Sequence, residues 1–196
     1  DPQALWVRRT SWAQIWPSLA IATGLLGVTN LIFAGLTALS EQIPAVHAAM
    51  SDYLDTAEAF SPAIGYGWLT LGIAVLAPVS EELLFRGIIQ GELRRAMPEK
   101  WAIVIQAVLF ALFHGQPVQI AYVLLPALAL GALYAITRSI WIPIIVHIAF
   151  NFLGSVIPAA VGSDEPLLQI VSLTELAFIV IGFLALIALV LRERER

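Results

Sequence analysis

The chain consists of long apolar runs separated by short polar connections. A helix that crosses a membrane needs about 20 mostly apolar residues, and about six runs approach that length. We expect helices over 13–39, 62–80 running on to about 95, 101–116, 118–137, 140–158 and 167–191. The pattern predicts an all-α, polytopic transmembrane bundle of about six helices, forming a single membrane-embedded domain over 1–196.

The charged residues between these runs predict the orientation of the chain. The two long connections, 40–61 and 159–166, carry acidic residues and no Lys or Arg. The basic residues lie at Arg8 and Arg9, between 94 and 100, at Arg138 and between 192 and 196. Since Lys and Arg favour the cytoplasmic side, both termini should be cytoplasmic and both acidic connections outside. We therefore expect a multi-pass protein of the plasma (inner) membrane.

The first run should be a membrane helix that stays in the protein. The segment that leads into it, with Trp6, Arg8 and Arg9, lacks the small-residue pattern of a cleavage site. The sequence starts at Asp1 without a methionine, which suggests a shortened chain.

The composition supports a membrane protein and narrows its chemistry. Apolar residues make up 60% of the chain and charged residues 12%, whereas soluble domains average about half and a quarter. No basic stripe accompanies the net charge of −4, so no nucleic-acid partner is expected. The absence of cysteine excludes a cysteine nucleophile and cysteine-ligated zinc. His47, in the first acidic connection, is expected to be solvated.

A small set of polar residues interrupts the apolar runs. Such residues are costly at membrane depth and usually mark function. They are Glu81, Glu82 and Arg86 in one run, His114 in the next, and His147 with Asn151 in a third. At 1.5 Å per residue, they lie about 14–20 Å along their helices from the nearest basic anchors, so they could meet at one depth.

Helical spacing assigns different tasks to the carboxylates. Glu82 and Arg86 are four residues apart and suited to an ion pair that braces the helix. Glu81 points about 100° away and is left free for proton chemistry. His147 and Asn151 are also four apart and could donate hydrogen bonds to one oxygen, as an oxyanion hole requires.

Two further residues have a structural as well as a functional interpretation. His114 stands where Gly115 and Pro117 should end its helix, so it could be either a cap or a site residue. Pro78 should kink its helix one turn before Glu81, for structural or catalytic reasons. The whole polar set could also be a network that holds helices together.

The three polar motifs resemble those of the CPBP family, which includes the type II CAAX prenyl endopeptidases and bacterial relatives of the Abi type. The family pattern EExxxR, FxxxH and HxxxN reads here as EELLFR from Glu81, FALFH ending at His114, and HIAFN from His147. The order is right, all three are complete, and the resemblance covers about 62–155.

This resemblance implies an intramembrane endopeptidase without a serine or cysteine nucleophile. It implies that Glu81 is the general base and that His114 helps to hold the water. It further implies that His147 and Asn151 stabilise the oxyanion and that Glu82 and Arg86 support the site. The implied substrate is a peptide or a lipidated protein at the lipid bilayer; the oligomeric state stays open.

We expect no cofactor, with zinc as the alternative. Glu81, His114 and His147 could bind zinc as a His₂Glu set with an open position. The HExxH signature is absent, and zinc would leave the pairing of His147 with Asn151 unused.

Other functions fit the sequence less well. Ser80 has no positioned base, no rhomboid-like motif is present, and the aspartates expected of aspartyl chemistry lie in loops. A non-catalytic immunity or binding protein and a proton-relay transporter remain alternatives, although the repeated broken helices of transporters are missing. Some aromatic residues could line a lipid-accessible pocket, but we favour ordinary lipid-facing positions for them: Phe85, Phe113, Phe150 and Phe152.

Overall fold

The computed structural model describes residues 6–59 and 66–194, and this part of the chain is helical throughout, apart from short connections. Four of the helices are α1 (Trp12–Ser40), α6 (Glu99–Phe113), α7 (Pro117–Thr137) and α10 (Glu165–Arg194). Two composite helices run over 66–96 and 141–161, and each is built from consecutive segments. The predicted all-α class is confirmed, and each predicted run lies on one of these helices, with 62–65 outside the described residues.

Segments with wider, π-helical turns interrupt both of the composite helices. The first comprises α3 (Tyr66–Leu69), η2 (Thr70–Leu76), α4 (Ala77–Glu82), η3 (Leu83–Gln90) and α5 (Gly91–Ala96). The second comprises α8 (Trp141–Asn151), η4 (Phe152–Val156) and α9 (Ile157–Val161). Such turns are rare and often occur at functional sites. Here η3 directly follows Glu82 and contains Arg86, and η4 directly follows Asn151.

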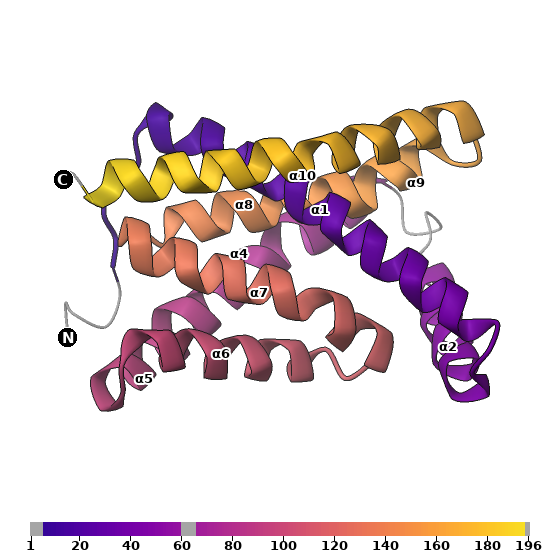
Figure 1. Ribbon diagram of the computed structural model, residues 1–196, viewed down its shortest axis with the longest axis horizontal. Helices are drawn as coiled ribbons and strands as arrows, with labels where there is room; N and C mark the ends of the chain where they lie inside the picture. Colours follow the sequence, from indigo (N-terminus) through magenta and orange to yellow (C-terminus); the bar gives the residue numbers. More distant parts are fainter. Residues whose placement is uncertain (1–5, 60–65, 195–196) are drawn as a thin grey trace.

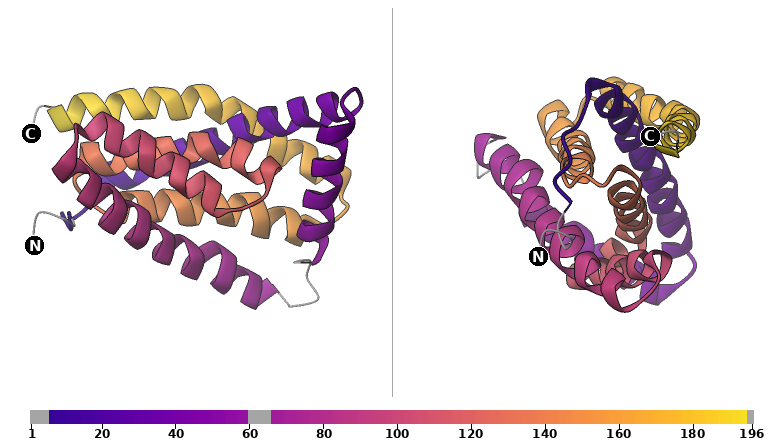
Figure 2. Two further views of the ribbon diagram at one scale, coloured as in Figure 1. Left: turned by 90° about the horizontal axis from the view of Figure 1, so that it is seen from below. Right: turned by 90° about the vertical axis from the view of Figure 1, so that its left-hand side faces the viewer.

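A further helix, α2 (Pro44–Ala59), was not predicted, because the sequence analysis treated 40–61 only as a connection. Proline is well tolerated at the start of a helix, and good helix formers follow it, so this polar segment can still be helical. Figure 2 shows α2 running across one end of the bundle. Gln116 donates to Thr56 Oγ1 at 2.8 Å, and the hydroxyls of Tyr53 and Tyr122 lie 3.1 Å apart. These contacts fix α2 to α7.

Four helices of the described chain are long and apolar enough to cross a membrane: Trp12–Ser40, Pro117–Thr137, Trp141–Val161 and Glu165–Glu193. The other two predicted spans are not among these four, and their sequences explain why. The helix over 66–96 contains the charged motif and its irregular turns, and α6 has only 15 residues. The bundle therefore combines four apolar spans, one of which carries His147 and Asn151, with two helices that are more polar or shorter.

The helices pack around α7, which passes through the middle of the bundle (Figure 1). Its residues contribute to three buried apolar clusters, through Leu130, Ala127 and Tyr134 respectively. On the outside, α1 and α10 lie side by side and antiparallel. Arg192 donates to the carbonyl of Ala13 at 3.3 Å, so α1 begins where α10 ends.

Glycines allow α1 and α10 to approach closely. A Cβ atom on Gly24 would lie 2.6 Å from the carbonyl oxygen of Phe178, and one on Gly182 would lie 2.8 Å from that of Ala20. Small residues at such contacts are typical of membrane helix pairs, because water contributes no hydrophobic driving force between helices in lipid.

We predict that Gly24→Ala destabilises the protein by about 1–3 kcal/mol, because the new methyl group meets rigid backbone. The measurement is thermal unfolding in detergent. Gly35→Ala on the same helix is the matched control, since a Cβ there meets nothing within 4 Å. Equal unfolding temperatures for the two variants would contradict close packing of α1 on α10.

Candidate active site

The two predicted carboxylates lie at the end of α4, between the π-helical segments η2 and η3. Glu82 is fully buried, whereas the side chain of Glu81 is 21% exposed. Neighbouring residues on a helix point about 100° apart. One carboxylate therefore enters the packed interior while the other lies at a cavity.

Glu82 and Arg86 form the predicted ion pair. Arg86 Nη1 lies 2.7 Å from Glu82 Oε1, and both side chains are fully buried. Arg86 Nη2 also donates to the carbonyl of Ala127 at 3.1 Å, and its guanidinium lies 4.6 Å from the centre of the Phe110 ring. A buried ion pair needs such additional partners to offset the loss of hydration. The pair thereby connects η3 to α7 and α6.

Glu82 has a second partner, which spacing on one helix could not reveal. His147 Nδ1 lies 2.7 Å from Glu82 Oε1. Since an ionised carboxylate only accepts hydrogen bonds, Nδ1 carries the proton. In the neutral ring the lone pair is then on Nε2, which lies 3.7 Å from Glu81 Oε2. Glu82 thus orients His147 toward Glu81.

His114 is held in a similar way. It follows the last residue of α6 and precedes Gly115, whose φ of +76° suits glycine. Its Nδ1 lies 2.9 Å from the carbonyl oxygen of Phe110, which can only accept, so Nε2 is again the free nitrogen. His114 is therefore at a helix end, as expected, and also lines the cavity beside Glu81.

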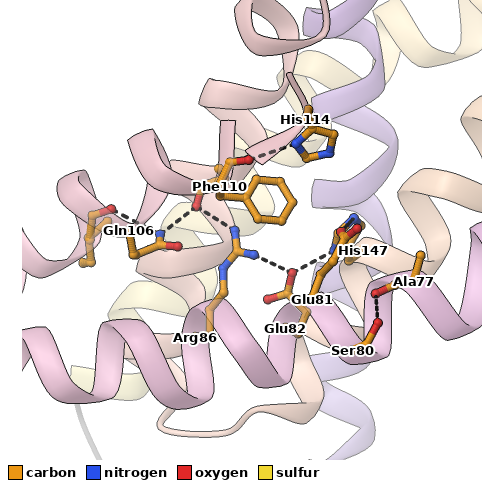
Figure 3. A network of polar contacts seen from close by, with 11 residues as sticks. Ala77, Ser80, Glu81, Glu82, Arg86, Gln106, Phe110, His114 and His147 are labelled. Carbon is orange, nitrogen blue, oxygen red and sulfur yellow. Dashed lines mark hydrogen bonds and ion pairs between the residues drawn. The ribbon is translucent and has the colours of Figure 1, made fainter. Parts of the chain in front are cut away.

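The ring of Phe110 contacts both imidazoles. Its centre lies 4.9 Å from that of His114 and 5.9 Å from that of His147 (Figure 3). Phe110 is only 2% exposed, and Phe85 packs against it in a T-shaped arrangement, with the ring centres 4.9 Å apart. An aromatic ring that contacts both imidazoles and Arg86 helps to fix their positions, a role that the sequence analysis did not assign.

Asn151 is used partly for structure. Its Nδ2 donates to the carbonyl of Ile73 at 3.0 Å. Ile73 lies five residues before Pro78, which has no N–H, so in a π-helical register this carbonyl lacks its usual donor. Asn151 supplies one. Its second amide hydrogen is not used by a contact among the described residues, and the side chain lines the cavity.

One cavity of about 640 Å³ brings the predicted residues together. Its walls include Glu81, His114, His147 and Asn151. It lies in the half of the bundle that α2 covers, and Tyr53 of α2 contributes to its wall. The volume is within the range of small-molecule and peptide sites. Glu82 and Arg86 stand behind the cavity wall rather than in it.

The expectation for the four phenylalanines needs a correction. Phe113 and Phe152 are 65% and 37% exposed, as lipid-facing residues would be. Phe85 is only 3% exposed and belongs to the core, and Phe150 lines the cavity. The apolar run could not distinguish these positions because both sides of a membrane helix are apolar.

The metal alternative was also compared with the geometry. Among residues 6–59 and 66–194, no three His, Cys, Asp or Glu side chains are grouped closely enough to hold a metal ion. Glu81, His114 and His147 share a cavity but do not form a ligand cluster as they stand. We derive no chemical step through zinc.

Several polar residues of this region escaped the sequence analysis. Gln106 donates to the carbonyl of Ala127 at 3.2 Å and so shares the acceptor of Arg86 (Figure 3). Gln90 donates to the carbonyl of Gly131 at 3.1 Å. On the far wall of the cavity, Asn30 faces Glu175. The signal for Glu175 was available, since it is an isolated carboxylate within a long apolar helix.

Comparisons with known proteins agree with the motifs. A protein of Bacillus subtilis (strain 168) named "Putative membrane peptidase YdiL" is 31% identical over 78 residues, which make up 40% of this chain and 32% of that protein. The chain thus matches about a third of the length of this curated relative. No solved structure matches the chain. Residues 63–153 match the family described as type II CAAX prenyl endopeptidase Rce1-like. This segment contains all three motifs, so the resemblance to the Rce1-like family covers the whole of the predicted site.

Proposed function

We propose that the protein is an intramembrane endopeptidase that hydrolyses a peptide bond with a water molecule activated by Glu81. The observation that carries this proposal is the position of Glu81 Oε2, 3.7 Å from His147 Nε2 in a cavity that His114 also lines. A water molecule that both groups bind there would be held against a general base.

The reaction uses only groups of this chain and one water. Glu81 accepts a proton from the water. At the same time, the oxygen of the water forms a bond to the carbonyl carbon of the substrate. The carbonyl oxygen becomes an oxyanion, which the second amide hydrogen of Asn151 can stabilise. The carbon–nitrogen bond then breaks, and the proton held by Glu81 passes to the leaving nitrogen.

His147 and His114 have different parts in this scheme. Neutral His147, whose Nδ1–H is held by Glu82, accepts a hydrogen bond from the water through Nε2 and helps to align it for attack. His114, fixed through Nδ1 by the carbonyl of Phe110, holds the water from the other side. Glu82 and Arg86 are positioning residues, because their contacts act through His147 and α7.

The arrangement of the chain ends supports one orientation in the membrane. The start of α1 and the end of α10 lie together, and the basic residues of the chain ends favour the cytoplasm for this end. The plasma (inner) membrane and two cytoplasmic termini are part of this proposal. A lipidated peptide is the substrate that the family name suggests. Comparing the cleavage of matched prenylated and unmodified peptides would test whether the protein requires a prenyl group.

We predict that Glu81→Gln lowers cleavage of a fluorogenic peptide by at least about 100-fold, because it removes the base and keeps the shape. The assay uses purified protein in detergent, with unfolding temperature as a check on folding. Ser80→Ala is the matched control, since Ser80 is exposed and bonds only to carbonyls of its own helix. Full cleavage by Glu81→Gln would remove Glu81 from this role. A wild-type protein that cleaves no peptide would favour the non-catalytic alternative.

We predict that Glu82→Gln destabilises the protein by about 3–5 kcal/mol, because Arg86 keeps its charge in a fully buried position without a counterion. Glu92→Gln is the control: its pair with Arg95 spans 3.0 Å at the surface of the same helix, and its loss costs about 0–1 kcal/mol. Unfolding in graded denaturing detergent compares the two. Similar stability losses would show that burial of the Glu82 pair is not important.

We predict that the protein keeps its full activity after dialysis against a strong chelator, since Glu81 and the imidazoles act on water directly. Elemental analysis of the same sample would verify that metal has been removed. Loss of activity that returns on addition of zinc would overturn the metal-free mechanism and favour the His₂Glu alternative.

A further inference from the structure

A second polar cluster lies on the wall of the cavity formed by α1 and α10. Asn30 Nδ2 donates to Glu175 Oε2, and both residues line the cavity together with Thr29. Glu175 is only 6% exposed. It is the sole charged residue of α10 between Glu165 and Arg192. A carboxylate at this depth in a membrane costs free energy, and such residues usually mark a functional site.

Holding α1 against α10 does not explain this carboxylate. The two helices already pack closely through Gly24 and Gly182. Glu175 Oε1 has no hydrogen-bond partner among residues 6–59 and 66–194, and its single bond to Asn30 leaves the carboxylate incompletely satisfied. The hydroxyl of Thr29, which is 9% exposed, is likewise buried without a partner in the described structure. These acceptors suit a ligand that brings hydrogen-bond donors.

The charge of the cavity indicates which donors it would take. Its described walls contain Glu81 and Glu175 but no Lys or Arg. Arg86, the nearest buried cation to the site, is already paired with Glu82. The covering helix α2 carries only acidic charges among its ionisable residues other than His47. The negative charge of the walls therefore favours binding of a cationic group in this cavity and repels an anionic group.

We propose that Glu175, supported by Asn30 and Thr29, is a specificity subsite for a cationic nitrogen of the peptide substrate. That nitrogen is a Lys or Arg side chain or an amino-terminal ammonium group. This inference rests on the proposed peptidase function. The subsite and Glu81 belong to the walls of one cavity of about 640 Å³, so a short peptide can reach both.

The test compares peptides that differ only in this charge. One has a blocked amino terminus and a lysine, the second has norleucine in place of the lysine, and the third has norleucine and a free amino terminus. Wild-type protein should cleave one of the two cationic peptides with a kcat/KM at least about tenfold above that of the neutral peptide, as expected for a charged hydrogen bond. Which of the two is preferred identifies the source of the nitrogen. No preference for either overturns the proposal, and this result needs no variant.

Variants then assign the preference to Glu175. In Glu175→Gln the cationic-to-neutral ratio of kcat/KM should fall to within about twofold of unity, whereas Glu175→Asp should retain part of it. Thr174→Ala is the matched control, because Thr174 is exposed and bonds to the carbonyl of Ile170 in its own helix. A ratio that Glu175→Gln leaves unchanged, even with a lower unfolding temperature, would show that Glu175 is structural.

A binding measurement separates this inference from the proposed catalysis. Binding of fluorescently labelled forms of both cationic peptides is measured in Glu81→Gln, with and without Glu175→Gln. The second substitution should raise the Kd of the preferred cationic peptide by about tenfold. This result can be obtained even if no peptide is cleaved, and would then support the subsite while the peptidase function fails. Kd values that Glu175→Gln leaves unchanged for both cationic peptides would overturn the subsite, whatever the activity.

Discussion

The arrangement of this site depends on one buried carboxylate. Glu82 Oε1 contacts both Arg86 and His147 at 2.7 Å, so one oxygen atom connects three groups from two helices. Arg86 extends the connection to the carbonyl of Ala127 in α7. In a low-dielectric interior each of these contacts is strong, and each is costly to leave unmade. The imidazole of His147 consequently has a single orientation, with Nε2 toward Glu81.

Two adjacent glutamates can have opposite functions because a helix separates neighbouring side chains by about 100°. Glu82 is enclosed by the bundle, while Glu81 reaches the cavity. The irregular turns on both sides of α4 fit this division, since π-helical segments change the direction in which side chains point. The irregular turns leave the carbonyl of Ile73 without its usual donor in its own helix, and the amide of Asn151 donates a hydrogen bond to it. The HxxxN motif thus has a structural role at Ile73 in addition to the chemical role proposed for it.

The cavity shows how a membrane bundle can keep polar groups at depth. One wall carries the three motifs, the opposite wall carries Glu175 with Asn30, and α2 covers the end nearest to both. The remaining lining is largely apolar, which suits a substrate that itself comes from or near the lipid. Close glycine packing between α1 and α10 helps to keep the second wall in place, and one oxygen of Glu175 remains without a hydrogen bond in the described structure.

The sequence by itself determined the helical class, the approximate helix bounds, the ion pair of Glu82 with Arg86 and the identity of the three motifs. These follow from local periodicity, because residues four apart on a helix are neighbours in any fold. Only the tertiary structure decided which side chains from different helices meet. The contact of Glu82 with His147, the contact of Phe110 with His147 and the opposite wall at Glu175 join residues that are far apart in the chain. In a bundle where most helix faces are apolar, hydrophobicity does not specify which face turns inward, so these contacts depend on packing between helices.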